Sequence, residues 1–273
     1  MRGALVGVCA VLLAAAVAGC GGSREAAPPT TTVRQLRQFR VVFPEGFTRV
    51  QMAARTGVVA KIAAREAHRK VKLSRKAYLE ATAHERSIPG FGAEKLALEG
   101  FLFPDTYDFD RTSTSAQLVK AQLQEFTSKW STVDLAYARS KNLTPYDVLT
   151  IASMVEGEAQ VPSERPLVAA VIYNRLHAHM SLGIDATLRY GLHIPPTQSL
   201  TDSELHSDNP YNTRNRPGLP PTPINNPGLA ALEAAAHPAK VDYLYFVRKP
   251  DHKHHYFTAN YQDFLQHEAE YGY

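Results

Sequence analysis

Residues 143–158 read LTPYDVLTIASMVEGE and predict a helix with one apolar face. Thr144 is expected to cap the first turn, because Pro145 suits the first helical position and Asp147 suits the third. At about 100° per residue, one continuous face collects the side chains of Val148, Leu149, Ile151, Ala152 and Val155. We therefore expect this helix to turn that face toward the protein interior.

Glu156 falls inside the apolar face, whereas Glu158 falls at its opposite border. A carboxyl group on an apolar face near a helix C-terminus has two reasons to keep its proton. Desolvation disfavours the charged form, and so does the negative end of the helix dipole. A carboxyl group that is protonated near neutral pH suits acid catalysis of glycosidic bond cleavage. The alternative is a structural salt bridge from Glu156 to Arg165 or Arg175, and periodicity alone leaves both open.

The composition of the 273-residue chain is that of an ordinary globular protein, with 44% hydrophobic and 21% charged residues. The formal net charge of +4 is mild and scattered, so nucleic acid is not an expected partner. The two cysteines are Cys9 and Cys20. Beyond residue 20 the chain can therefore form neither a disulfide, nor a thiolate nucleophile, nor a zinc site with cysteine ligands.

The N-terminal residues predict that the protein is located outside the cytoplasm. Arg2 precedes an apolar run at 4–18 that is shorter than the ~20 residues of a membrane-spanning helix, so residues 1–19 are interpreted as a signal peptide. Residues 17–20, VAGC, resemble the lipobox of bacterial lipoproteins, which predicts lipidation of Cys20 and a lipid anchor on the outer face of the cell membrane. An uncleaved anchor helix is the alternative. Residues 20–37 contain Gly, Ser, Pro and Thr and predict a flexible tether.

The folded part is expected to belong to the α+β class, because its strands and helices do not alternate as repeated βαβ units. A small α+β module is predicted at 38–112, and a mixed helical domain that ends in a β-hairpin is predicted at 113–273. The expected elements are a strand at 38–43 closed by a Pro44-Glu45-Gly46 turn, helices at 48–70, 74–83 and 114–140 (with Ser115 as N-cap), and hairpin strands at 242–248 and 254–258.

Several blocks of sequence resemble, in the same order, the MltG-type (YceG-like) endolytic murein transglycosylases. They are LEGFLFPDTY at 98–107, ASMVEGEA at 152–159, SER at 163–165, VAAVIYNRL at 168–176, PYNT at 210–213, GLPPTPI at 218–224, NPG at 226–228, HPAK at 237–240 and DYLYFV at 242–247. One block departs from the family. Residues 183–187 read GIDAT where the family usually reads Gln-Ser-Asp-Pro-Thr, although Asp185 and Thr187 remain.

The resemblance implies a lyase that cleaves MurNAc–GlcNAc bonds within peptidoglycan glycan strands and leaves 1,6-anhydro-MurNAc ends. It implies that Glu156 is the catalytic acid, that no cofactor is needed, and that the enzyme terminates the elongation of nascent strands, with peptidoglycan synthases as partners. It also implies that 38–112 is a LysM-like module and that 113–273 is the YceG-like catalytic domain.

Further residues are expected at the site. Flat rings and amide donors in the loop at 211–213 suit a sugar-binding groove, and a polar residue at 174 on an otherwise apolar helix suits a role in orienting Glu156 or in capping a turn. The expected substrate-binding residues are Asn174, Asp185, Thr187, Tyr211, Asn212 and Thr213, and the expected supporting residues, paired as ions, are Glu158, Glu164, Arg165 and Arg175. No metal is expected at His252, His254 and His255, because they flank a hairpin turn beside lysines without a carboxylate cluster.

A single carboxyl group can carry transglycosylation. Glu156 would protonate the departing glycosidic oxygen and then accept the proton of the primary hydroxyl of the sugar, which attacks the anomeric carbon. Glu158 projects about 200° away on a helix, so these two residues are not expected to form the carboxylate pair of a hydrolase, although Asp185 or Glu164 could approach Glu156 from elsewhere. The alternatives are a muramidase that uses water, a non-catalytic peptidoglycan-binding protein, and a solute-binding lipoprotein, whose two α/β lobes the sequence does not predict.

Overall fold

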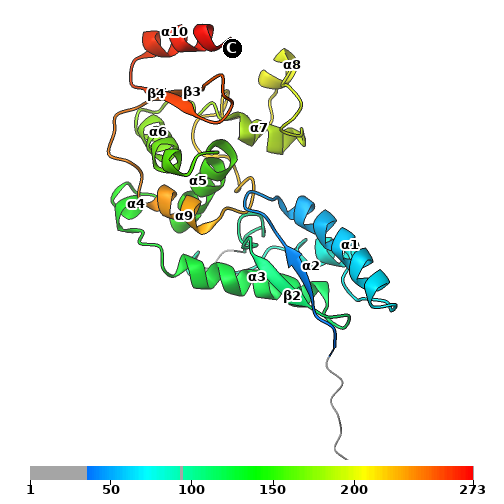
Figure 1. The fold of residues 1–273 in the computed structure, drawn as a ribbon. Helices are drawn as coiled ribbons and strands as arrows, with labels where there is room; N and C mark the ends of the chain where they lie inside the picture. The colour runs from blue at the N-terminus through cyan, green and yellow to red at the C-terminus, as the bar shows by residue number, and fades with distance from the viewer. Residues whose placement is uncertain (1–35, 93–94, 273) are drawn as a thin grey trace, which may run out of the picture. The chain divides into compact units, whose positions relative to one another are not determined.

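The computed structural model describes residues 36–92 and 95–272. The predicted signal peptide, the predicted lipobox with Cys20 and nearly all of the predicted tether lie outside these residues. The elements, most of them labelled in Figure 1, are β1 (Phe39–Val42), α1 (Arg49–Glu66), α2 (Arg75–Ala81), β2 (Thr106–Phe109), α3 (Ser115–Trp130), α4 (Ala136–Ser140), α5 (Pro145–Glu158), the 3-10 helix η1 (Pro162–Glu164), α6 (Arg165–His177), α7 (Asp185–Leu192), α8 (Asp202–Leu205), α9 (Leu229–Ala236), β3 (Tyr245–Arg248), β4 (His255–Thr258) and α10 (Tyr261–Tyr271).

The first part of the fold is built on a two-stranded antiparallel sheet. β1 pairs with β2 in a register that places Phe39 opposite Phe109 and Val42 opposite Thr106. Between the two strands, α1 and α2 pack against each other, and α1 also contacts β1. The strand at 38–43 and the two helices at 48–70 and 74–83 are thereby confirmed, each somewhat shorter than predicted.

The long helix predicted at 114–140 is wrong, because the chain breaks it into α3 and α4. The hydroxyls of Ser131 and Thr132 donate to main-chain carbonyls of the last turn of α3 and so end that helix. The carboxylate of Asp134 then accepts from the main-chain N–H of Ala136 at the start of α4. The predicted cap was also one residue off. Thr114, not Ser115, accepts the N–H of the third helical residue.

α5 lies at the centre of the second part. The hydroxyl of Thr144 accepts from the N–H of Asp147, whose carboxylate accepts in return from the N–H of Thr144, which confirms the predicted start. Every residue from Val148 to Val155 is buried, because α6, α7 and α9 cover the helix. α5 therefore has no solvent-facing side over two turns, and the single apolar face predicted for it understated its burial.

The C-terminal part consists of the predicted hairpin and one further helix. β3 and β4 pair antiparallel, with Tyr245 opposite Thr258 and Arg248 opposite His255, and α10 packs on both strands. With two small antiparallel sheets among helices, the α+β class is confirmed. The described residues form one compact unit, and the boundary at 112/113 stays a prediction. In the part of the chain that the structure describes, no helix has the length and hydrophobicity needed to cross a membrane.

Candidate active site

A groove of about 1470 Å³ brings together residues that are distant in sequence. Glu156 and Glu158 reach it from the last turn of α5, Asp185 from the start of α7, and Glu99 from the segment before β2. Arg248 of β3 lines it as well. The groove is thus bordered by several carboxyl groups and by cations, which is the chemical character of a site that binds a polar ligand.

Glu156 is a nearly buried carboxyl group of the groove. Its side chain is 8% exposed, and Oε2 accepts a hydrogen bond of 3.2 Å from the main-chain N–H of Gly228. Nη2 of Arg165 lies 3.8 Å from Oε1, which is longer than a hydrogen bond. Burial, followed by the charge of Glu45, raises the pKa of Glu156, while Gly228 and Arg165 oppose the rise. The carboxyl therefore holds its proton more firmly than an exposed glutamate does.

Glu45 is a neighbour of Glu156 that the sequence analysis did not identify. It belongs to the turn after β1, and its Oε2 lies 3.8 Å from Nη2 of Arg165. The same turn lies beside Glu156, because a Cβ added to Gly46 would lie 3.5 Å from Cγ of Glu156. The Pro44-Glu45-Gly46 pattern predicted only the end of a strand, and nothing local in it indicated a contact with a residue more than 100 positions away.

Glu158 occupies a different environment from Glu156. Burial, with a contribution from Asp185, raises its pKa. The carboxylate accepts a long hydrogen bond of 3.4 Å from the main-chain N–H of Ala186. The expected ion pair with Arg165 or Arg175 is not formed within the residues described. Glu158 therefore faces the α7 side of the groove, away from the Gly228 contact of Glu156.

Glu164 also has a partner other than the expected arginines. Its Oε1 accepts from the main-chain N–H of His255 at 3.0 Å, and its Oε2 lies 2.8 Å from Nδ1 of the same histidine. Both residues are buried. The pair ties η1 to β4, which is a structural role, and the 91 positions between the two residues hid it from the sequence.

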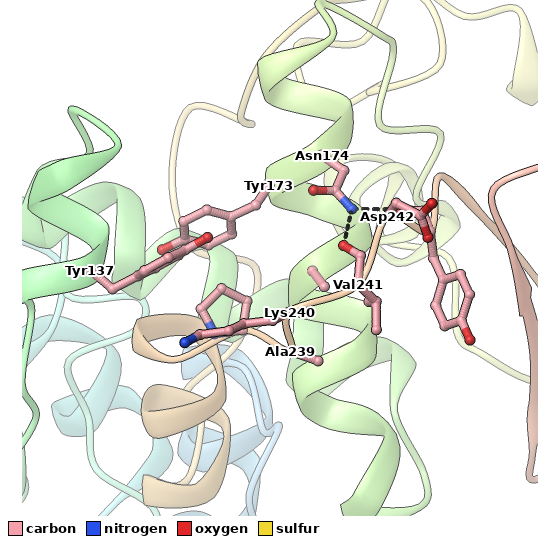
Figure 2. Close-up of a pocket in the computed structure, with 10 residues that line it drawn as sticks. Tyr137, Tyr173, Asn174, Ala239, Lys240, Val241 and Asp242 are labelled. Atoms are coloured by element: carbon pink, nitrogen blue, oxygen red, sulfur yellow. Dashed lines mark hydrogen bonds between the residues drawn. The ribbon is translucent and has the colours of Figure 1, made fainter.

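Asn174 and Arg175 of α6 hold the segment that leads into β3. The amide nitrogen of Asn174 donates to the carbonyls of Val241 and Tyr243 at 3.0 and 2.9 Å, and Arg175 Nε donates to the carbonyl of Leu244 at 2.6 Å. Figure 2 shows Asn174 in a second cavity of about 540 Å³, whose lining also includes Tyr137, Tyr173, Lys240 and Asp242. Glu156 does not line this cavity, so the expected role of Asn174 in orienting Glu156 is not what the contacts show.

The remaining predicted substrate-binding residues come from the first turn of α7 and from the loop at 211–213. Thr187 and Thr213 are buried with their hydroxyls 3.0 Å apart, and buried Asn212 donates to the main-chain carbonyls of Leu205 and Ser207. Tyr211 places its hydroxyl 2.8 Å from that of Thr222. Asp185 alone of this set lines the groove, where Arg214 donates to its carboxylate at 2.6 Å. Contact of these residues with a substrate stays a prediction.

Glu99 and Asn226 are further residues that sequence reasoning did not assign to the site. Glu99 accepts from the main-chain N–H of Arg49, from the amide of Asn226 and from the hydroxyl of Tyr190, at 2.9, 2.8 and 3.1 Å. Burial raises the pKa of Glu99 to about 7. Glu99 belongs to the family-like block at 98–107, but the resemblance of that block does not indicate that its side chain reaches the groove.

Asn226 joins three segments of the chain through its side chain. Its Oδ1 accepts from the main-chain N–H groups of Gly100 and Leu102, both at 2.9 Å. Its Nδ2 donates to the carbonyl of Phe47 at 2.9 Å and to Glu99. Gly100 has a φ of +92°, and a Cβ there would lie 2.7 Å from the ring of Pro223, so the close approach of these loops requires glycine.

The sequence profile of the YceG-like family matches residues 24–270. The chain belongs to the YceG-like family. It is 40% identical over 156 residues to an endolytic murein transglycosylase of Bacillus subtilis, covering 57% of this chain and 43% of that protein. It is 31% identical over 252 residues to one of Streptococcus pneumoniae R6, covering 84% and 44%. The chain thus spans less than half the length of these curated relatives.

A solved structure agrees with this membership. A putative YceG-like protein from Listeria monocytogenes superposes with a TM-score of 0.66 at 29% sequence identity, over 83% of this chain and 75% of that one. The family resemblance stated from the sequence blocks is therefore confirmed.

In chemical terms, the groove of this YceG-like chain offers a proton donor that is also a competent acceptor. Glu156 is protonated more readily than usual, yet the Gly228 N–H and the nearby Arg165 stabilise the carboxylate that remains after proton transfer. Within 36–92 and 95–272, no three residues of the types His, Cys, Asp or Glu are grouped so as to hold a metal ion. His254 and His255 instead contact Asp251 and Glu164.

Proposed function

We propose that this protein is an endolytic murein transglycosylase, a lyase that cleaves MurNAc–GlcNAc bonds within peptidoglycan strands, with Glu156 as its catalytic residue. The observation that carries the proposal is the position of Glu156, which lines the groove and is nearly buried, so that burial raises its pKa. The names of the curated relatives in Bacillus subtilis and Streptococcus pneumoniae support the same reaction.

The proposed reaction needs one carboxyl group and no water. Glu156 donates its proton to the glycosidic oxygen while the bond from the MurNAc anomeric carbon to that oxygen breaks. The C6 hydroxyl of the same MurNAc forms a new bond to the anomeric carbon, and its proton returns to Glu156. The hydroxyl is held beside its target by the sugar ring itself, which is the advantage of an intramolecular attack. The 1,6-anhydro end forms and the acid is regenerated.

The test is to digest purified peptidoglycan with the protein lacking residues 1–32 and to identify the new ends by mass spectrometry. Anhydro-MurNAc ends on products several disaccharides long support an endolytic transglycosylase. Reducing MurNAc ends indicate a muramidase that uses water, and intact strands that sediment with the protein indicate a non-catalytic peptidoglycan-binding protein. A solute-binding lipoprotein would show neither cleavage nor sedimentation.

We further propose that residues 38–112 are a LysM-like module and that residues 113–273 are the catalytic domain. The order of strand, Pro-Glu-Gly turn and helix over 39–66 supports the first assignment. Termination of nascent strands, with peptidoglycan synthases as partners, follows from the proposed reaction, because cleavage within a strand that is still being extended separates it from its growing end.

We also propose that the protein is held on the outer face of the cell membrane by a lipid on Cys20, with residues 20–37 as a tether. The support is the VAGC sequence at 17–20 after an apolar run. Metabolic labelling with a lipid probe tests it. The label is expected on the wild type and absent from Cys20→Ala, and equal labelling of both would contradict the lipoprotein assignment.

A further inference from the structure

Three charged residues from separate parts of the chain meet beside Glu156. Nη2 of Arg165, at the start of α6, lies 3.8 Å from Oε2 of Glu45 and 3.8 Å from Oε1 of Glu156. The same nitrogen is therefore shared by two carboxylates, which are separated by at most twice that distance. Glu156 is 8% exposed and Glu45 is 48% exposed, so the pair has an inner and an outer member.

The position of Glu45 depends on the loop before α9. A Cβ added to Gly228 would overlap Oε1 of Glu45, so the Glu45 carboxylate occupies the space that a side chain would need there. The N–H of Gly228 meanwhile donates to Glu156. The N–H of Gly46 donates to the carbonyl of Asn226 at 3.0 Å, which fixes the turn against that loop. Gly228 thus lies in contact with both carboxylates.

Arg165 forms a close ion pair with neither carboxylate. Its side chain is 13% exposed, and its Nε is buried without a hydrogen-bond partner among the residues that the structure describes. A fully formed arginine–carboxylate pair has N···O distances of about 2.7–2.9 Å, often at two nitrogens. If Arg165 closed on Glu156 in that way, it would strongly stabilise the charged carboxylate at the expense of the acid.

We propose that Glu45 is a positioning residue for Glu156, which holds the Arg165 guanidinium between two carboxylates and so prevents a full ion pair with Glu156. The effect of Glu45 on catalysis rests on the proposed function, whereas its effect on the protonation of Glu156 does not. The groups that face Glu156 are Glu45 from the turn after β1, Arg165 from α6 and the N–H of Gly228 from the loop before α9. Of these, Glu45 alone favours the protonated form.

The first test measures Glu156 directly. In protein with carbon-13-labelled glutamate carboxyl groups, the signal of Glu156 is assigned by its absence in Glu156→Gln and is titrated by NMR. In Glu45→Gln the midpoint for Glu156 is expected to fall, because a negative neighbour is lost and Arg165 becomes free to pair. The matched control is Glu66→Gln. Glu66 is similarly exposed, at 45%, and carries an ion pair with Arg37 at 2.6 Å. An unchanged midpoint in Glu45→Gln would overturn the proposal.

The second test uses the pH dependence of glycan cleavage. Glu45→Gln is expected to move the high-pH limb of kcat to lower pH and to leave KM nearly unchanged. The loss at neutral pH should be smaller than the roughly 10²–10⁴-fold loss expected from removing the acid itself. Glu45→Asp keeps the charge and should restore the limb. If the high-pH limb of kcat lies at the same pH in Glu45→Gln as in the wild type, the proposal is contradicted.

The two tests also separate the two proposals. A wild type that cleaves no glycan contradicts the proposed function, while the NMR titration still decides whether Glu45 controls Glu156. If Glu45→Gln does not fold, Gly228→Ala replaces it in the titration, because the added methyl group displaces the Glu45 carboxylate without changing its charge. The Glu156 midpoint is then expected to fall, and a constant midpoint counts against the proposal.

Discussion

The main-chain N–H of Gly228 donates to Oε2 of Glu156, so the loop before α9 holds a carboxyl group that α5 carries 72 positions earlier in the chain. A glutamine at 156 can accept the same hydrogen bond but cannot exchange a proton. We therefore expect Glu156→Gln to lose about 10²–10⁴-fold or more in the rate of glycan cleavage while it still folds. Mass spectrometry of digested peptidoglycan gives the rate.

Thermal melts of the same variant separate catalysis from a structural salt bridge. Because burial raises the pKa of Glu156, its contribution to stability is full below the ordinary glutamate pKa and is lost as pH rises through the higher folded value. At neutral pH Glu156→Gln should thus be as stable as the wild type or slightly more so. A large drop in Tm, with activity falling only in proportion, would show that pairing with Arg165 is its main role.

Glu99 gives a prediction for the pH dependence of stability. Its folded pKa of about 7 lies above the ordinary value of 4.5, so its contribution is full below about 4.5 and is lost as pH rises through 7. The free energy of unfolding, measured in urea from pH 5 to 8, should fall by up to about 1.4 kcal/mol per pH unit from this group. Glu99→Gln should remove that part of the slope, and equal slopes in both proteins would contradict it.

Gly228→Ala tests the packing of Glu45 against the loop. Gly228 has a φ of −78°, which alanine adopts without strain, so the effect of the substitution comes from the methyl group alone. That group overlaps the end of a flexible, half-exposed side chain, which can move. We expect a Tm close to that of the wild type and a several-fold loss of cleavage. Full activity would show that the position of Glu45 does not matter.

The adjacent residues His254 and His255 form a matched pair for stability measurements. Each lies beside a carboxylate, Asp251 at 2.7 Å and Glu164 at 2.8 Å, but only His255 is buried. His255→Ala leaves buried Glu164 without its side-chain partner, so we expect a loss of about 3–5 kcal/mol in the free energy of unfolding. His254→Ala should change it little, because its partner stays hydrated. The free energies of unfolding are measured in guanidinium chloride. Similar losses in the two variants would show that burial of the pair does not determine its contribution to stability.

Local signals explain what the sequence predicted well. Thr144, Pro145 and Asp147 define the start of α5 within four residues, and the periodicity that follows places Glu156 beside buried positions. The hairpin strands were recognisable for the same reason, because their turn lies between them. The break between α3 and α4 was missed because Ser131 and Thr132 end the helix through hydrogen bonds that compete with its continuation, and such residues also occur inside helices.

The rest of the site could not be predicted because it depends on contacts across the chain. Glu45, Glu99 and Asn226 come from a turn, a connecting segment and a loop, and none carries a periodic pattern that indicates what it will face. The partner of Glu164 is likewise set by the packing of η1 against β4, where a buried histidine is nearer than any arginine. A family resemblance marks such residues as members of motifs, but it does not show which of them touch.

The side chain of Asn226 makes assembly of the groove a late event in the life of the chain. It bonds Phe47, Glu99, Gly100 and Leu102, and these four hydrogen bonds cannot form until residue 226 has left the ribosome and docked. Contacts over such separations form slowly, since long loops must close first. A truncated or half-folded copy would hold Glu156 without the turn and loop that surround it. Under the proposed function, such a copy lacks the complete groove that glycan cleavage needs.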